Sequence, residues 1–131
     1  MFMLDTDTCS YVLKKRPVAV LEKFRRVGPD ALVISAITAA ELHYGAERHP
    51  TRSTEIRRDI DDFLSRLVVL PWRAEREYAR ARHALESNGN KIGNNDLLIG
   101  THALAEGATL VTNNLKHFRR ISGLRIENWV A

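Results

Sequence analysis

Three acidic residues that lie far apart in this chain each border a short apolar segment. Asp5 ends the run Phe2–Leu4, Glu41 lies just past the run 31–35, and Asp96 opens a further apolar stretch. In an open α/β sheet, side chains at the carboxyl ends of strands and in the helices that follow converge on one crevice. Three converging carboxylates supply the hard oxygen ligands that divalent cations prefer. The pattern predicts a metal-dependent enzyme that acts on phosphate.

Each of these acids also has a purely structural interpretation. Asp5 begins the polar segment Asp5–Thr8 and could simply cap a helix, because Asp and Thr accept hydrogen bonds from unpaired N–H groups there. Glu41 follows Thr38 at the spacing of a capping box. Asp96 could be a first-turn acid that the helix dipole favours. Three such coincidences beside strand ends are less expected than any one of them.

Short apolar segments alternate with helical patterns along the chain, which predicts an α/β fold. A parallel sheet whose strands alternate with helices has helices over both faces. All 131 residues are expected to form a single domain. The expected strands are Phe2–Leu4, Leu32–Ser35, Val68–Leu70, Thr109–Val111 and Leu124–Glu127, and the expected helices cover about 11–15, 18–27, 37–46, 56–67, 74–87 and 96–106.

The composition limits the class of protein. The chain is 44% hydrophobic and 27% charged, as in ordinary globular domains. No apolar run approaches the roughly 18 residues that span a bilayer, so we expect no membrane segment. The N-terminus reaches Asp5 almost at once, which argues against a secretory signal. Cys9 is the one cysteine, a small buried hydrophobe by expectation, and a reducing cytoplasm fits.

The chain is basic, with a net charge of +4 and a pI of about 9.6. Solvated helix faces explain any single basic cluster. Basic clusters around an acidic centre also suit a polyanion whose backbone is held while its phosphate is cut. An acidic protein partner would use the same surface.

Four motifs and a C-terminal ending follow one another along the chain. They are MLDT at 3–6, ISAITAAELHYG at 34–45, IGNNDLLI at 92–99, LVTNNLKHF at 110–118 and GLRIENW at 123–129. Any one of them is weak evidence, but the ordered set is highly specific. Together they resemble the PIN-domain ribonuclease toxins of the VapBC type over essentially the whole chain.

This resemblance implies a small three-layer α/β/α PIN-like domain with a central parallel sheet. It implies an endoribonuclease toxin of a type II toxin–antitoxin pair that depends on Mg²⁺, with Mn²⁺ as an alternative, and cleaves structured RNA such as tRNA. It also implies a homodimer inhibited by a VapB-type antitoxin, whose C-terminal segment enters the active-site groove. DNA would be contacted only indirectly, through the antitoxin.

Carried over by position, Asp5, Glu41 and Asp96 become the acidic triad that holds the metal. Glu41 is the expected group to orient or deprotonate the attacking water. The auxiliary active-site residues expected from the same motifs are Thr6, Asp7, Thr112 and Asn114. Lys116, Arg119 and Arg120 are candidates for holding the RNA backbone.

The chain departs from the family pattern at three positions. Asn114 stands where PIN domains in general have a fourth acid, although many VapC-type sequences share the Asn. His117 stands where an acid is common, and its plain interpretation is a solvated loop residue. An imidazole cannot balance a second Mg²⁺, which argues against two-metal operation. Asp7 replaces the usual Asn and either strengthens metal attraction or caps a helix.

Two alternatives remain open at this stage. Asp5 and Asp7 after an apolar strand also resemble the opening motif of haloacid-dehalogenase-type phosphatases, in which the first Asp attacks phosphorus. Lys91 is the only lysine near Asp96, closer than that family's pattern requires. A PIN-like module that binds RNA or protein with little catalysis is the second alternative.

Overall fold

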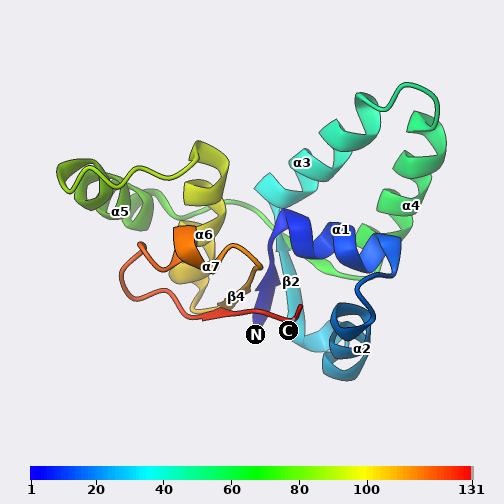
Figure 1. Ribbon diagram of the computed structural model, residues 1–131, viewed down its shortest axis with the longest axis horizontal. Coiled ribbons are helices and arrows are strands. Elements are labelled where there is room, and N and C mark those ends of the chain that lie inside the picture. Colours follow the sequence, from blue (N-terminus) through cyan, green and yellow to red (C-terminus); the bar gives the residue numbers. More distant parts are fainter. Residues whose placement is uncertain (131) are drawn as a thin grey trace.

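The computed structural model describes residues 1–130, which build a five-stranded parallel sheet between helices (Figure 1). The strand order is β3-β2-β1-β4-β5, and every neighbouring pair is parallel. The α/β class, the parallel sheet and the helices on both of its faces are therefore confirmed. The strands are β1 (Phe2–Leu4), β2 (Leu32–Ser35), β3 (Val68–Leu70), β4 (Thr109–Val111) and β5 (Ile126–Glu127).

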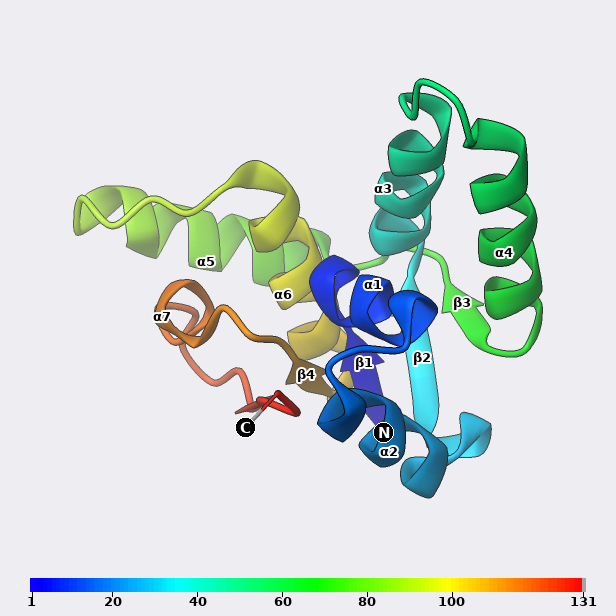
Figure 2. The ribbon, with the colours of Figure 1, turned by 45° about the vertical axis from the view of Figure 1, so that its right-hand side comes forward.

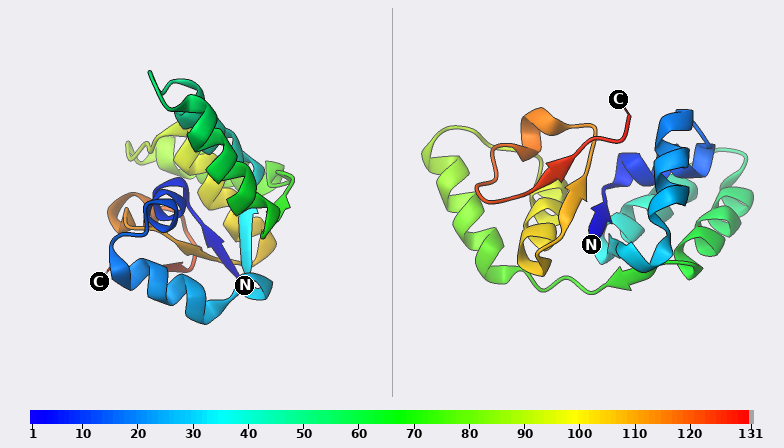
Figure 3. Two further views of the ribbon diagram at one scale, coloured as in Figure 1. Left: turned by 90° about the vertical axis from the view of Figure 1, so that its right-hand side faces the viewer. Right: turned by 90° about the horizontal axis from the view of Figure 1, so that it is seen from below.

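Helices connect consecutive strands and lie on both sides of the sheet. In the right-hand view of Figure 3, the strands separate α5 and α6 from α1, α2 and α4. The helices are α1 (Thr6–Lys14), α2 (Val18–Val27), α3 (Ala36–Glu47), α4 (Ser53–Ser65), α5 (Glu75–Ser87), α6 (Asn94–Glu106) and α7 (Leu115–Phe118), with a 3-10 turn η1 (Pro29–Ala31) before β2. None of the helices described is long and apolar enough to cross a membrane.

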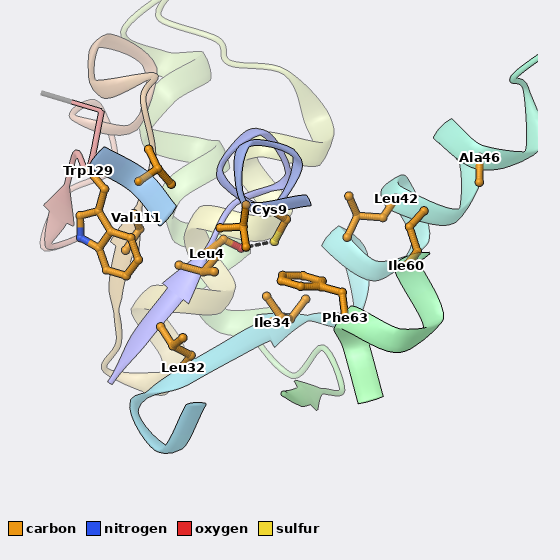
Figure 4. Close-up of a cluster of buried hydrophobic side chains, with 12 residues drawn as sticks. Leu4, Cys9, Leu32, Ile34, Leu42, Ala46, Ile60, Phe63, Val111 and Trp129 are labelled. Atoms are coloured by element: carbon orange, nitrogen blue, oxygen red, sulfur yellow. Dashed lines mark hydrogen bonds between the residues drawn. The ribbon is translucent and has the colours of Figure 1, made fainter. Parts of the chain in front are cut away.

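The alternation of side chains along the central strands divides the core into two clusters. Met3 pairs in register with Val33 on one side and Leu110 on the other, and these three side chains pack towards α5, α6 and α7. Their neighbours Leu4 and Val111 point to the opposite face, because successive strand residues alternate between faces. Figure 4 shows this second cluster, which packs towards α1, α2, α3 and α4.

Helix α1 begins earlier than the sequence pattern predicts. The expectation of a short helix at 11–15 is wrong, because α1 starts at Thr6, directly after β1. The Asp5 carboxylate accepts a hydrogen bond from the Thr8 backbone N–H at 2.9 Å and caps this helix. The cap fixes the turn from strand to helix and holds the Asp5 carboxylate at the sheet edge.

Helix α3 is capped differently from the expected capping box. The cap residue is Ser35, whose hydroxyl accepts a hydrogen bond from the Ile37 N–H at 3.1 Å. Thr38 is a fully buried residue inside the helix. Glu41 therefore lies in the second turn of α3 and takes no part in capping this helix. Near the C-terminus, β5 covers Ile126–Glu127, two residues shorter than the expected strand.

Candidate active site

The candidate site lies where β1, β2 and β4 end and α1, α3 and α6 begin (Figure 2). Asp5 follows β1 and is 6% exposed, and its backbone N–H bonds the Val111 carbonyl of β4. The Thr8 hydroxyl donates to the same carbonyl at 3.1 Å. Asp5 is thus tied to two adjacent strand ends as well as to the start of α1.

Glu41 reaches this position from α3 and is held by the two other helix starts. Its Oε1 accepts a short hydrogen bond from the Thr6 hydroxyl of α1. Its Oε2 accepts a hydrogen bond from Asn95 Nδ2 of α6 at 3.0 Å. Each carboxylate oxygen has two lone pairs, so both retain capacity for a further ligand or water.

Asp96 follows Asn95 in the first turn of α6 and faces α7. Its Oδ2 lies 3.7 Å from Nδ1 of His117. The same ring nitrogen is 2.9 Å from Asn114 Nδ2. The expectation that His117 is a solvated loop residue is therefore wrong, since it is half-buried in α7 and contacts the candidate site.

The Thr112–Asn114 segment after β4 completes the site. Thr112 is buried, and its hydroxyl accepts a hydrogen bond from the Asn114 N–H at 2.9 Å. Its side chain also hydrogen-bonds Asp5. A continuous circuit of side-chain contacts and adjacent chain positions therefore joins the predicted residues Asp5, Thr6, Glu41, Asp96, Thr112 and Asn114. It runs through Asn95 and His117, which were not predicted, and leaves out Asp7.

Burial and like charges disfavour ionisation at the centre of the site. Desolvation raises the pKa of Asp5 above its usual value, with a smaller contribution from the Asp7 charge, while hydrogen bonds from Thr112 and Thr8 act the other way. Desolvation also raises the pKa of Asp96, and the charge of Glu41 adds to it. A positive charge placed among these groups would relieve both effects.

These carboxylates fit a hard divalent cation by donor chemistry, although they are not closed around one point. Within residues 1–130, no three His, Cys, Asp or Glu side chains are arranged as a ready ligand cluster. The reason is visible in the contacts, because Glu41 is held by Thr6 and Asn95 while Asp96 leans towards His117. Asp5, Glu41 and Asp96 are the residues that would hold an ion.

The remaining predicted residues lie around the rim. Asp7 is exposed on the first turn of α1. Lys116 and Arg119 are exposed on and just after α7, where neither forms an ion pair within the described residues. Arg120 is half-buried and donates through Nη1 to the Lys91 carbonyl at 3.2 Å.

An open groove of about 830 Å³ leads away from the site between α1 and the α3–α4 pair. Thr6, Asp7 and Glu41 of the candidate site are among the residues that line it. Its walls combine apolar and charged side chains, which suits a bound peptide segment that is both amphipathic and charged. They include Leu13, Leu42, Ile56 and Ile60, together with Lys14, Arg16, Arg48, Arg52 and Asp59.

Several residues of the site carried no assigned role in the sequence interpretation. Asn95 stood inside a quoted motif, and its place immediately before Asp96 at a helix start is the signal that could have singled it out. Ser35 and His102 were missed. The fully buried His102 ring places Nδ1 2.7 Å from Ser35 Oγ and so joins α6 to the start of α3. No local pattern reveals this contact, because 67 residues separate the pair.

Residues 2–124 match the PIN domain family, so the chain belongs to the PIN-domain proteins. Within that family its relatives are of the VapC ribonuclease type. Ribonuclease VapC2 of Haemophilus influenzae is 41% identical, with 98% of each chain covered. The tRNA(fMet)-specific endonuclease VapC of Salmonella typhimurium is 39% identical over 98% of this chain and 97% of its own.

Solved structures show the same likeness. The VapBC2 complex of Rickettsia felis, bound to a DNA fragment from its promoter, matches with a TM-score of 0.89 at 41% identity over 98% of both chains. DNA-bound VapBC of Salmonella typhimurium matches with a TM-score of 0.91 at 38% identity, covering 98% of this chain and 97% of that one. The predicted three-layer PIN-like fold and the resemblance to VapBC toxins are confirmed. The family assignment leaves the haloacid-dehalogenase-type alternative without support.

Proposed function

We propose that this protein is a metal-dependent endoribonuclease that acts as the toxin of a type II toxin–antitoxin pair. The observation that carries the proposal is the circuit of side-chain contacts that brings Asp5, Glu41 and Asp96 to one end of the sheet. Sequence identity of about 40% to VapC ribonucleases over nearly the full length supports the proposal. The cytoplasm is the compartment in which such an enzyme would meet RNA.

The cofactor we propose is Mg²⁺, with Mn²⁺ as an alternative, held by Asp5, Glu41 and Asp96. A divalent cation there would lower the pKa of a nearby water and neutralise charge that builds on the phosphate. The pKa values of Asp5 and Asp96, both raised mainly by burial, support this assignment, because a bound cation would offset the cost of keeping these carboxylates ionised.

The protein's own residues divide the remaining work. Glu41, fixed by Thr6 and Asn95, orients the attacking water and accepts its proton. The water oxygen bonds to phosphorus, the bond to the 3′-oxygen breaks, and that oxygen takes up a proton. Asn114 hydrogen-bonds a non-bridging phosphate oxygen. Because water and not the 2′-hydroxyl attacks, the products carry a 5′-phosphate and a 3′-hydroxyl.

Structured RNA such as tRNA is the substrate class we propose. Lys116 and Arg119 would contact the phosphate backbone, because they are exposed beside the site and make no competing ion pair within residues 1–130. Arg120 would act mainly by holding the segment at Lys91.

The proposed protein partner is a VapB-type antitoxin, with DNA contacted through it. The groove between α1 and α3–α4 would receive the antitoxin's C-terminal segment, since Asp7 and Glu41 of the candidate site line this groove. A homodimer is proposed as well. Tyr44 on α3 is 66% exposed and available for an interface, whereas Phe63 of α4 is buried in the core.

A panel of structured RNAs, incubated with Mg²⁺ or with EDTA, tests the activity. We expect cleavage with Mg²⁺ only, 5′-phosphate ends, and no detectable cleavage by Asp5→Asn or Asp96→Asn protein of unchanged circular dichroism. The matched control is Asp30→Asn, because Asp30 is exposed in η1, before β2, at the opposite end of the sheet.

Full activity of Asp5→Asn or Asp96→Asn would contradict the assignment of the site. RNA binding without cleavage under every metal condition would favour the binding-module alternative. Turnover of small phosphate esters with a phosphorylated Asp5 would revive the phosphatase alternative.

A further inference from the structure

A second cavity, of about 210 Å³, lies between the C-terminal half of α5 and the segment that leads into α6. Its floor is apolar and consists of Leu85, Ile92 and Leu97. Leu85 and Leu97 are buried and also belong to the core cluster of that sheet face. The cavity therefore has a rigid apolar base formed by packed side chains.

The rim of the cavity is polar and exposed. It is formed by Arg82 and Glu86 of α5, Lys91 of the connecting segment, and Asn94 at the start of α6. The Lys91 ammonium and Asn94 Nδ2 donate to no other group among residues 1–130. Two hydrogen-bond donors are thus available to a bound molecule.

Arg82 presents a fixed planar surface at this rim. Its guanidinium lies 5.9 Å from the centre of the Tyr78 ring, donates through Nε to Glu86 at 3.0 Å, and donates through Nη1 to the Tyr78 hydroxyl at 3.1 Å. The Tyr78 hydroxyl in turn donates to Asn94 Oδ1 at 3.2 Å. Unstacked RNA bases pack on aromatic rings and on guanidinium planes held in this way.

The cavity adjoins the candidate active site. Asp96 itself does not line the cavity, but the segment that lines it passes close to this carboxylate. A Cβ added at Gly93, between the lining residues Ile92 and Asn94, would lie 4.0 Å from Asp96 Oδ2. Arg120, which follows the helix of His117, binds the Lys91 carbonyl and fixes the cavity's outer edge. Figure 1 shows α5, α6 and α7 grouped on this side of the sheet.

The size and charge of the cavity select its occupant. Its volume is below the roughly 300–1,000 Å³ of pockets that hold drug-sized ligands, so it suits a single ring system. Lys91, Arg82 and the nearby Arg120 outnumber the single acid Glu86, which favours a ring attached to a polyanion.

We propose that this cavity receives one unpaired nucleobase of the RNA substrate, next to the bond that is cut, and thereby gives the enzyme a base preference. The proposal rests on the proposed RNA-cleaving function. The base stacks on the Arg82 guanidinium, its edge meets Lys91, Asn94 and Glu86, and its apolar face covers the floor.

The first test uses hairpin RNAs that differ only in one loop nucleotide beside the cleaved bond, which carries each of the four bases or none. We expect wild-type protein to cleave its preferred base roughly 5- to 100-fold faster than the abasic hairpin. Arg82→Lys should bring the five rates together, because lysine keeps the charge and loses the plane.

The matched control is Arg80→Ala, an exposed arginine of the same helix that lies outside the cavity. It should lower all five rates by a similar factor and keep their ratios. Equal cleavage of the abasic hairpin by wild-type protein, or unchanged ratios in Arg82→Lys, would overturn the proposal.

A binding measurement separates this proposal from the proposed nuclease activity. The loop nucleotide is replaced by 2-aminopurine, and its fluorescence is followed in EDTA, where no cleavage is expected. A fluorescence change with wild-type protein that is lost in Arg82→Lys supports the base cavity even if no RNA is ever cut. Unchanged fluorescence when wild-type protein binds the RNA overturns the base cavity and leaves the nuclease proposal intact.

Discussion

Asn95 donates a hydrogen bond from Nδ2 to Oε2 of Glu41, and this 3.0 Å contact joins the first turn of α6 to the second turn of α3. The two residues are 54 positions apart, and each lies next to or within the proposed acidic triad. Asn95 therefore orients the Glu41 carboxylate without being a proposed metal ligand itself.

Asn95→Ala is expected to weaken catalysis more than it weakens the fold. Glu41 would keep only its contact with Thr6, and losing a side chain that orients a ligand typically costs roughly 10- to 100-fold in metal affinity or activity. RNA cleavage over a Mg²⁺ titration measures the effect. Asn90→Ala is the matched control, because Asn90 is exposed and its side chain makes no hydrogen bond in residues 1–130. Equal activity of the two variants would contradict this role.

Asp5→Asn is expected to stabilise the metal-free protein at neutral pH. The pKa of Asp5 is raised in the fold, so the folded state binds more protons than the unfolded state between the ordinary and the raised pKa, and stability falls as pH rises through that window. Asparagine removes the buried charge and still caps α1. Urea unfolding in EDTA at pH 7 should show a gain on the order of 1 kcal/mol.

Mg²⁺ should reverse this difference in unfolding free energy, so that the wild-type protein becomes the more stable of the two. An ion that binds only the folded wild-type protein adds about 2.7 kcal/mol at one hundred times its dissociation constant, and Asp5→Asn should lose most of this gain. Unfolding curves with and without Mg²⁺ for both proteins test this. A variant less stable than wild type in EDTA would show that the Asp5 charge itself stabilises the fold.

His102 is expected to make the protein sensitive to mild acid. Burial lowers the pKa of this fully buried ring, although the Glu106 charge and the Pro71 backbone act in the opposite direction. The folded state therefore binds fewer protons than the unfolded state below about pH 6.5, and stability is lost as pH falls from there towards the lowered pKa. Above about pH 6.5 the ring is neutral in both states, and this loss of stability does not occur.

The comparison of His102→Asn with wild type isolates this effect. Asparagine can still meet Ser35 but cannot be protonated, so the variant's unfolding free energy should change less between pH 6.5 and 5. Its stability at pH 8 should be lower because the smaller side chain leaves a cavity. His83→Asn, at an exposed position of α5, is the control and should keep the wild-type pH slope. Parallel slopes in all three proteins would rule out His102 as the sensor.

The strands were predictable because local sequence dominates their formation. β1, β2, β3 and β4 have the expected bounds, since each is a short apolar run that lies between helical patterns. The start of α1 was not predictable from periodicity, because its first turn is polar. Thr8 of that turn is buried, and its hydroxyl donates a hydrogen bond to the Val111 carbonyl, 103 residues away.

The same division holds at the candidate site. Asp5, Glu41 and Asp96 were identifiable because each residue type stands at a recognisable boundary or motif. Their mutual arrangement depends on contacts such as Thr6 with Glu41 and His117 with Asp96, which join separate helices. Sequence spacing carries no information about these contacts. The capping-box interpretation of Glu41 fails for a local reason, because α3 begins at Ala36 with Ser35 as its cap and Thr38 lies inside the helix.

Gly100→Ala is expected to destabilise the protein through the contact between α6 and the segment of α7. A Cβ at this position would lie 2.5 Å from Cδ1 of Ile121 and 3.1 Å from Cδ1 of Phe118. Both neighbours are buried and cannot swing into solvent, so the overpacking should cost about 1–3 kcal/mol in urea unfolding. Gly45→Ala is the matched control inside α3, where nothing lies within 4 Å, and it should gain about 0.5–1 kcal/mol from helix propensity.

Because α6 carries Asp96 and α7 carries His117, Gly100→Ala should also lower RNA cleavage at temperatures where it remains folded. Equal stability of Gly100→Ala and wild type would mean that Ile121 and Phe118 can repack at no cost.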